Sequence, residues 1–219
     1  MNWSLIWLGF QETCMMTLWT SVISYLLGLP LGVLLVITRK DGIRPAPTFN
    51  AVLGAIINFL RSIPFILLIA MLIPVTRLVM GTSIGTTASV FPLVISATPY
   101  IARVVEQSFL EVDGGVIEAA RAMGSSTWQI IWKVLIPESV PSLVTGAAMA
   151  VTTILAYTAM VSAVGGGGGI GAYAITKGYQ RGKKYYDFMY MASAVLVLMV
   201  QVIAITGTRL TRRLDHRIR

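Results

Sequence analysis

The sequence predicts an all-α polytopic membrane protein with five transmembrane helices and one structured cytoplasmic loop. Of its 219 residues, 56% are hydrophobic and only 12% are charged, and the mean hydropathy is +0.78. Roughly a quarter of the residues of a soluble domain carry charge. A spanning helix needs about 20 apolar residues, so the expected organisation is a single transmembrane domain over residues 1–219 without a separate soluble catalytic domain.

The first predicted span lies in a long early run without charge. No charged residue occurs between Glu12 and Arg39, which predicts a helix over about 13–38. We expect this helix to be retained rather than removed as a signal peptide, because the run is long and no Lys or Arg precedes it. Gly28 and Gly32 near its end predict either a close approach of two helices or a kinked terminus.

Four further spans are predicted from later apolar runs. The second covers about 55–79, and its beginning depends on whether Arg61 snorkels to the membrane surface. The third covers about 84–105 and is rich in Ser, Thr and Pro, which favours a position inside the helix bundle where neighbouring helices satisfy polar groups. The fourth covers about 141–164 and ends at a run of five glycines, and the fifth covers about 188–208.

Five spans place the two ends of the chain on opposite sides of the membrane. With the C-terminal tail in the cytoplasm, eleven basic residues of the loops and tail lie inside and five lie outside. Because cytoplasmic loops carry an excess of Lys and Arg, the sequence predicts an outside N-terminus and a cytoplasmic C-terminus. This distribution accounts for the net charge of +8 without nucleic acid as a partner. The inside residues are Arg39, Lys40, Arg44, Arg103, Arg121, Lys133, Arg209, Arg212, Arg213, Arg217 and Arg219.

Motifs of enzymes and cofactor sites are missing from the sequence. It contains no G-x-x-x-x-G-K-[ST] phosphate loop, no H-E-x-x-H and no G-x-S-x-G, so ATP binding, zinc proteolysis and serine hydrolysis have no candidate residues. Its Cys, His and carboxylate residues show no metal-ligand spacing. A G-x-G-x-x-G match at Gly166, Gly168 and Gly171 follows a membrane span rather than a strand, which argues against a nucleotide site. We expect no enzyme activity, cofactor or metal on this chain.

The longest cytoplasmic segment, about 106–138, is predicted to begin with a short helix. Asp113 is expected to be its N-cap, since an Asp side chain accepts hydrogen bonds from the first free amides. Glu118 lies in the early turns, where a carboxylate complements the helix dipole. Gly124 is expected to end the helix.

A second short helix is predicted to follow directly. Ser126 and Gln129 have the spacing of a capping box, which opens a helix. Pro137 is expected to end it. The segment is therefore predicted to be a helix, a glycine turn and a second helix on the cytoplasmic face.

This segment also carries a motif with long, specific spacing. The letters E-A-A at 118–120 are followed after three residues by Gly124 and after nine more by V-L-I-P at 134–137. The pattern resembles the E-A-A-x3-G-x9-I-x-L-P signature of permease subunits of bacterial ATP-binding-cassette (ABC) importers. Val for Ile and Ile for Leu are the departures, and both keep apolar bulk.

The wider sequence is similar to the methionine importer branch of this family nearly end to end. The resemblance implies five spans in the bacterial cytoplasmic (inner) membrane, with the N-terminus outside. It also implies that the chain is the transmembrane subunit of an ATP-driven amino-acid importer, with methionine as the substrate. The matching stretches are F-L-R-S-I-P-F at 59–65, M-G-T-S-I-G at 80–85, P-Y-I-A-R at 99–103 and Y-T-A-M at 157–160.

The resemblance further implies the partners. In such importers the short helix with the E-A-A segment docks in a groove of a separate ATP-hydrolysing subunit, which binds the ATP and Mg. A second copy of the chain, two ATP-binding subunits, an extracytoplasmic substrate-binding protein and membrane lipid are the implied partners. The implied coupling residues are Glu118, Ala119, Ala120, Gly124 and Pro137.

The translocation route is predicted from the fourth span. With Arg77 and Arg103 counted in the loops at the span ends, Arg61 is the one ionisable side chain placed inside a span, so the spans lack the buried carboxylates that a proton-coupled carrier needs. Thr153, Tyr157 and Met160 share a helix face. This face is expected either to line the pathway as a gate or to pack against neighbouring helices.

Two other classes compete with the importer. An ATPase-independent channel or ion-coupled carrier for a small solute needs no ATPase. A structural or assembly protein would leave the helical loop without a purpose. Co-purification with a subunit that carries a phosphate loop distinguishes the importer from both.

Overall fold

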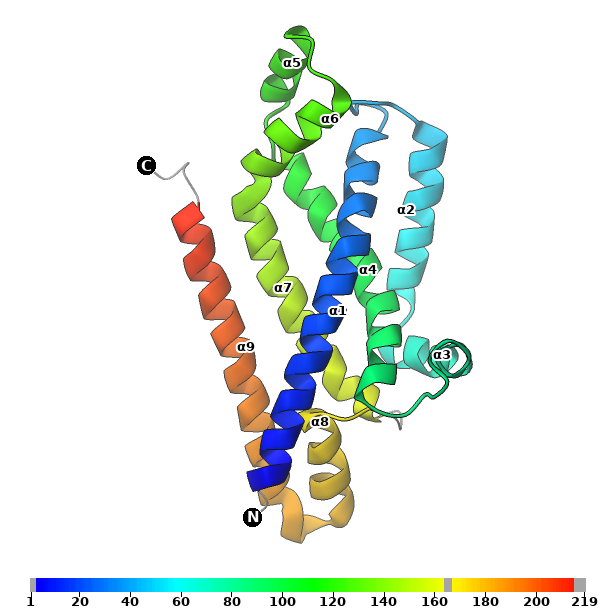
Figure 1. The fold of residues 1–219 in the computed structure, drawn as a ribbon, viewed down its shortest axis with the longest axis vertical. Coiled ribbons are helices and arrows are strands. Elements are labelled where there is room, and N and C mark those ends of the chain that lie inside the picture. The colour runs from blue at the N-terminus through cyan, green and yellow to red at the C-terminus, as the bar shows by residue number, and fades with distance from the viewer. Residues whose placement is uncertain (1–2, 164–166, 215–219) are drawn as a thin grey trace. The chain divides into compact units, whose positions relative to one another are not determined.

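The computed structural model describes residues 3–163 and 167–214, and these residues contain helices and no strand (Figure 1). The prediction of an all-α fold is confirmed. Pro30 lies within the first helix without ending it. The longest helices are α1 (Trp3–Ile37), α4 (Thr86–Leu110), α7 (Ile136–Ala163) and α9 (Tyr186–Leu214).

Four helical stretches of the described residues are long and apolar enough to cross a membrane. They cover 3–37, 86–110, 127–161 and 183–214. Two shorter helices, α2 (Pro47–Ser62) and α3 (Phe65–Met80), meet this criterion only as a pair with a break between them. Counting that pair as one span gives up to five.

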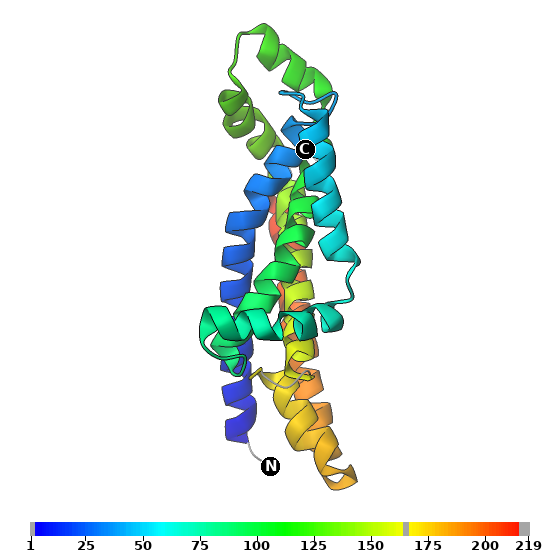
Figure 2. The ribbon, with the colours of Figure 1, turned by 90° about the vertical axis from the view of Figure 1, so that its right-hand side faces the viewer.

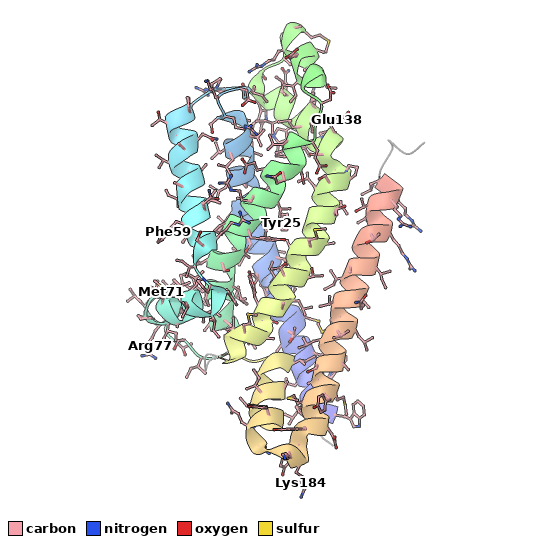
Figure 3. The ribbon with its side chains drawn as sticks, turned by 180° about the vertical axis from the view of Figure 1, so that it is seen from behind. Tyr25, Phe59, Met71, Arg77, Glu138 and Lys184 are labelled. Atoms are coloured by element: carbon pink, nitrogen blue, oxygen red, sulfur yellow. The ribbon has the colours of Figure 1, made fainter. Side chains whose placement is uncertain are left out.

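The break between α2 and α3 falls within the predicted second span, 55–79. Pro64 has φ −54° and ψ 131°, an extended conformation, and a proline disfavours helical backbone at the residue before it. The predicted span is therefore two helices rather than one. The sequence prediction missed this break because it used hydropathy, which does not register Pro64. Phe59 on α2 and Met71 on α3 are both exposed on the chain (Figure 3).

The second helix of the predicted loop does not end at Pro137. Instead, α6 (Thr127–Ile130) continues through a π-helical turn (Ile131–Leu135) into α7 without a break. The backbone N–H of Ile136 donates to the carbonyl of Ile131, a longer step than in an α-helix. A π-turn rearranges the carbonyls next to Pro137, which has no N–H to donate, so the helix tolerates the proline.

The chain forms two compact units, and the long helices contribute residues to both. The first unit contains residues 1–24, 63–97 and 150–205, and the second contains 25–62, 98–149 and 206–219. A buried apolar cluster in the first unit joins the first half of α1, α3, α4 and the end of α7. Its members are Met16, Phe65, Ile69, Leu93 and Val161.

The core of the second unit joins α1, α2 and α4 through Leu35, Ile57 and Ala102. A Cβ atom at Gly28 would lie 2.7 Å from Ile101 Cγ2, and one at Gly32 would lie 2.6 Å from the Val105 side chain. These distances leave room only for hydrogen, so the two glycines allow a close approach of α1 and α4. This alternative of the sequence prediction is confirmed, and α1 continues past both glycines to Ile37.

A hairpin of residues 170–189 belongs to the first unit and precedes the long part of α9. It consists of α8 (Ile170–Tyr173), a π-helical turn (Ala174–Gly178) and two 3-10 turns (Tyr179–Arg181 and Lys183–Tyr185), which fold back beside the first turns of α9 (Figure 2). Lys184 lies at its tip (Figure 3). Two residues of the glycine run that was expected to end the fourth span, Gly165 and Gly166, lie outside the described residues.

Candidate coupling site and candidate pathway helix

The helix with the E-A-A segment is α5 (Gly114–Ala122), and its beginning is fixed by Asp113. An Asp113 carboxylate oxygen accepts a hydrogen bond from the N–H of Gly115 at 2.7 Å. A side chain in this position satisfies one of the amides that lack a partner within the helix. The predicted N-cap is confirmed.

Gly124 ends α5 in the predicted way. It has φ +78°, in the left-handed region that favours glycine. Its N–H donates to the carbonyl of Arg121 at 2.9 Å, and the N–H of Ser125 donates to the carbonyl of Ala120 at 3.1 Å. This pair of bonds is the Schellman motif, which satisfies the last carbonyls of a helix.

The capping box of α6 is also present. Ser126 Oγ accepts from the N–H of Gln129 at 3.3 Å, and the Gln129 side chain accepts from the N–H of Ser126 at 2.8 Å. Both ends of the turn between α5 and α6 are therefore held by hydrogen bonds within a few residues of sequence. We call residues 113–137 the coupling loop, and Figure 1 shows α5 and α6 joined by this turn.

α5 has an exposed apolar face. Val116, Ala119 and Met123 lie three and four residues apart, so they share one side of the helix. Val116 is 43% exposed and Met123 is 79% exposed, and Ala119 is exposed as well. In the part of the chain that the structure describes, this face remains exposed.

The two alanines of the motif lie in different surroundings. Ala119 is exposed, whereas Ala120 is 3% exposed and packs within the chain. Glu118, Gly124 and Pro137 are exposed. A Cβ atom at Gly124 would meet nothing within 4 Å, so inside this chain the glycine is required for its backbone conformation and not for space.

Arg121 anchors α5 to the loop between α1 and α2. Its guanidinium donates to the carbonyl of Gly42 at 3.1 Å and to the carbonyl of Ile43. A cavity of about 250 Å³ lies beneath, with Ile117 and Phe109 in its lining. From the sequence, Arg121 was expected only as one of the basic residues of the loops, because its acceptors are backbone carbonyls almost 80 positions away, which no local pattern marks.

Two tryptophans of the coupling loop were also not singled out from the sequence. Trp128 and Trp132 are both exposed and lie edge to face with ring centroids 5.5 Å apart. Their spacing of four residues places them on one helix face. They extend the exposed apolar surface of the loop.

A buried ion pair in α4 was missed as well. Arg103 Nη1 lies 2.6 Å from Glu106 Oε2, and Glu106 is 8% exposed. Arg103 also donates to the carbonyl of Gly54 at 3.1 Å and to Asn58 Oδ1 at 2.8 Å, which ties α4 to α2. Both residues lie in α4, within the candidate span 86–110, whereas from the sequence Arg103 was assigned to the cytoplasmic loop and only Arg61 was named within a span. The spacing of three between Arg103 and Glu106 was the available signal.

The candidate pathway residues lie on α7 in the first unit. Tyr157 stacks on Phe65 of α3, with ring centroids 4.0 Å apart and planes 16° apart, against the apolar cluster of that unit. Thr153 is half-buried and Met160 is exposed. Tyr157 thus makes packing contacts, while Met160 leaves an open position on the same face. Among the described residues, no three His, Cys, Asp or Glu side chains are grouped so that they could hold a metal ion.

A family model described as the binding-protein-dependent transport system inner membrane component matches residues 24–219 of this chain. The chain belongs to this family. A probable D-methionine transport system permease protein of Vibrio cholerae is 42% identical to this permease over 219 residues, with 99% of this chain and 95% of the relative covered. The D-methionine transport system permease protein of Escherichia coli K12 is 44% identical over 163 residues, with 73% and 75% covered.

Solved structures give the same result for the fold. A chain of the MetNI methionine ABC transporter in an inward-facing conformation matches this permease with a TM-score of 0.93 and 40% identity, over 98% of each chain. A chain of an amino acid ABC transporter solved with histidines matches with a TM-score of 0.77 at 22% identity and shows the shared fold. The predicted resemblance and the predicted function, a multi-pass inner-membrane permease subunit of an ABC importer, are confirmed.

Proposed function

We propose that this permease imports methionine as part of an assembly with a second copy of itself, two ATP-binding subunits and an extracytoplasmic substrate-binding protein. The observation that carries the assembly is the exposed apolar face of α5, formed by Val116, Ala119 and Met123. Methionine as the substrate rests on relatives that are named for D-methionine transport. Since the chain has no phosphate loop, ATP and Mg are bound by the partner.

The coupling loop has the surface that docking in a protein groove requires. An exposed apolar helix face with a small residue at its centre allows close contact with the walls of a groove. On α5 the small residue is Ala119, between Val116 and Met123. Glu118 lies beside this face and is available to a basic side chain of the partner, while Gly124 and Pro137 are exposed at later positions of the loop.

Displacement of α5 has a direct route into the rest of the second unit. Arg121 ties α5 to the carbonyls of Gly42 and Ile43 in the loop that joins α1 to α2. In addition, α6, the π-helical turn and α7 follow one another without interruption. A pull on the coupling loop would therefore act on α1, α2 and α7, which is the kind of rigid-element movement that switches transporters between states.

The face of Thr153, Tyr157 and Met160 is the proposed pathway lining or gate. A thioether and an aromatic ring favour an uncharged, polarisable solute side chain. Cysteines introduced at these three positions in a Cys14→Ser background should react with a small thiol reagent in one nucleotide state and be protected in the other. Protection in both states would assign the face to packing alone.

We also propose that the N-terminus lies outside and the C-terminus in the cytoplasm, on the excess of basic residues in the predicted inside loops. Reporter fusions at each end should give opposite compartments. Two fusions in the same compartment would contradict the five-span arrangement.

Reconstitution tests the proposed function as a whole. The chain should co-purify with a subunit that carries a phosphate loop, and the reconstituted assembly should take up methionine only with ATP. Uptake of D-methionine and L-methionine should each exceed that of histidine, the control amino acid. Activity of the chain purified alone would favour the ATPase-independent channel or carrier instead, and equal uptake of histidine would contradict the substrate.

A further inference from the structure

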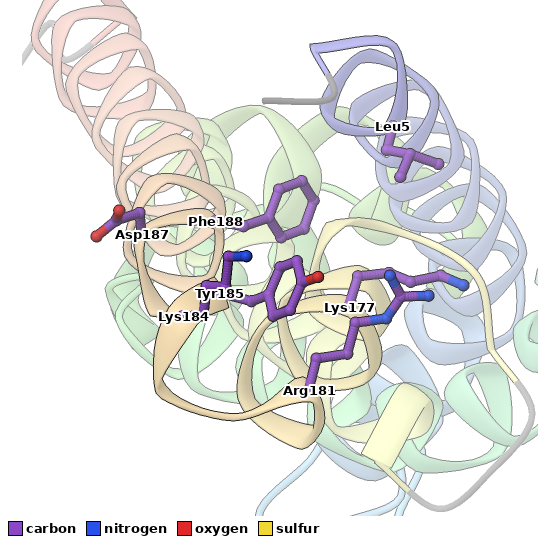
Figure 4. A pocket seen from close by; sticks show the side chains of 7 residues that line it. All are labelled: Leu5, Lys177, Arg181, Lys184, Tyr185, Asp187 and Phe188. Atoms are coloured by element: carbon purple, nitrogen blue, oxygen red, sulfur yellow. The ribbon is translucent and has the colours of Figure 1, made fainter.

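A cavity of about 560 Å³ lies between the first turns of α1 and the hairpin of residues 170–189 (Figure 4). All of its lining belongs to the first unit. Its volume is in the range of cavities that hold small molecules. The lining residues are Leu5, Lys177, Arg181, Lys184, Tyr185, Asp187 and Phe188.

The cavity carries uncompensated positive charge. Three cationic side chains line it and one carboxylate, Asp187, does so. The two ion pairs found among the described residues involve Arg39 with Asp41 and Arg103 with Glu106, so the cations of the cavity lie beyond 4.0 Å of any described carboxylate. Such a group of Lys and Arg side chains favours an anion with several acceptor oxygens.

Arg181 is held in place by an aromatic ring. Its guanidinium carbon lies 5.8 Å from the centroid of the Tyr185 ring, in a cation–π contact. This contact orients the guanidinium without neutralising it. Figure 4 shows the Lys177 and Arg181 side chains next to each other beside Tyr185.

The remaining walls are apolar. Leu5 comes from α1 and Phe188 from α9, and both are half-buried. A free phosphate ion gains nothing from such walls. A phospholipid, in contrast, places a phosphate directly beside its acyl chains.

The elements around the cavity carry exposed aromatic side chains of the kind that proteins place at a membrane surface. Trp3 and Trp7 on α1, Tyr179 in the hairpin and Tyr190 on α9 are all exposed. Tryptophan and tyrosine are enriched at the level of lipid headgroups. The cavity is therefore expected at headgroup depth, where a protein partner would have to displace lipid to reach it.

We propose that this cavity binds the phosphate headgroup of an anionic phospholipid. Lys177, Arg181 and Lys184 hold the phosphate, and Leu5 and Phe188 contact the upper part of the acyl chains. Basic pockets between membrane helices are known to suit lipid headgroups. The bound lipid would join α1 to the hairpin within the first unit.

Phosphatidylglycerol is the probe for the test. The full chain is purified and placed in nanodiscs of phosphatidylcholine with a small fraction of phosphatidylglycerol. The protein is then released from the nanodiscs, and native mass spectrometry counts the phosphatidylglycerol molecules that it retains. Each Lys or Arg near an anionic lipid contributes a factor of about five. The triple variant Lys177→Gln, Arg181→Gln and Lys184→Gln should therefore retain phosphatidylglycerol more than about tenfold less well, while Arg181→Lys should retain it.

Matched controls distinguish a lipid site from a general charge effect and from a protein surface. The triple variant Arg209→Gln, Arg212→Gln and Arg213→Gln removes equal charge elsewhere and should keep the bound lipid, and soluble glycerol 3-phosphate at equal concentration should not displace it. Equal loss in both triple variants would show a general charge effect and overturn the site. Displacement by glycerol 3-phosphate would overturn the lipid as occupant. If the triple variant of Lys177, Arg181 and Lys184 keeps the lipid but no longer binds the purified substrate-binding protein, the three cations belong to a protein surface instead.

Discussion

The coupling loop and the hairpin of residues 170–189 are both chains of short helices, but their shapes are fixed in different ways. In the coupling loop, Asp113 and Ser126 cap the helices with side-chain hydrogen bonds. None of the short helices from 170 to 185 has a cap from a side chain of its own segment, and the N–H of Ile170 donates instead to Thr13 Oγ1 of α1 at 2.9 Å. The hairpin is held by such long-range bonds and by packing, since Ala174 belongs to a buried cluster with Ala192 of α9.

This difference suits the two segments to different tasks. A loop whose shape is fixed by bonds a few residues apart keeps that shape when it is moved, which a docking element needs. A hairpin held by packing against α9 is stable only in place. The exposed surface of the hairpin is cationic, whereas that of the coupling loop is apolar. We therefore assign the hairpin to lipid and the coupling loop to a protein groove.

The largest expected effect comes from charge at Gly124. Both Asp and Asn tolerate its φ of +78°, and a Cβ there meets nothing within 4 Å inside the chain, so both variants should insert and fold. A carboxylate buried without a partner in the docked interface costs about 3 kcal/mol or more, which corresponds to a loss of at least about a hundredfold. Methionine uptake should be abolished in Gly124→Asp and largely kept in Gly124→Asn.

Expression and thermal unfolding of both Gly124 variants in detergent provide the control for folding. Equal loss of uptake in the two variants would mean that steric bulk, and not charge, is what the partner rejects. Normal uptake in Gly124→Asp would show that the coupling loop is not the docking element.

A smaller effect is expected at Arg121, within the coupling loop. Arg121→Gln loses the charged bonds to the carbonyls of Gly42 and Ile43, which are worth about 1–2 kcal/mol at an exposed site. The partner should still bind and hydrolyse ATP, while uptake per ATP falls about tenfold. Arg44→Gln, in the neighbouring loop, is the matched control and should leave the ratio unchanged. A parallel fall of hydrolysis and uptake would make Arg121 a docking residue rather than an anchor.

A methyl group at Gly178 tests the hairpin side of the comparison. A Cβ atom there would lie 2.8 Å from Met189 Cβ and 3.0 Å from the Met189 backbone nitrogen, so α9 and the hairpin must move apart. Overpacking of this kind costs about 1–3 kcal/mol. Gly178→Ala should lower the midpoint of thermal unfolding and speed hydrogen exchange in 170–189.

Gly114→Ala is the contrasting variant in the coupling loop. A Cβ at Gly114 meets nothing within 4 Å, and Ala is the better helix former. Its unfolding midpoint should be unchanged or slightly higher. A loss as large as that of Gly178→Ala would mean that the coupling loop also depends on packing.

The same contrast explains what the sequence could predict. The caps at Asp113, Gly124 and Ser126 involve residues a few positions apart, so local patterns contain them. The long apolar helices follow from composition, and only the break at Pro64 interrupts them in a way that hydropathy does not register. Pro137 was misjudged because the π-helical turn before it leaves no mark in the sequence.

The rest could not be predicted because it depends on distant partners. The acceptors of Arg121 are backbone carbonyls, which every residue has. Ala120 is buried and Ala119 is exposed only because of what packs on each side of α5. The stack of Tyr157 on Phe65 joins residues of two helices. The sequence supplied the residues of these contacts without their pairing.

The smallest expected effect isolates a single cap. Ser126→Ala removes the side-chain acceptor of the Gln129 N–H, and loss of a serine N-cap costs about 1 kcal/mol. Because α6 continues into α7, the cost should remain local, and hydrogen exchange should speed about fivefold at the first amides of α6 with no change of the unfolding midpoint. Ser125→Ala, one residue earlier, keeps the cap and should exchange like the unchanged chain. If the two variants exchange alike, the α6 start is held by tertiary packing as the hairpin is, and the coupling loop loses the local rigidity on which its docking role depends.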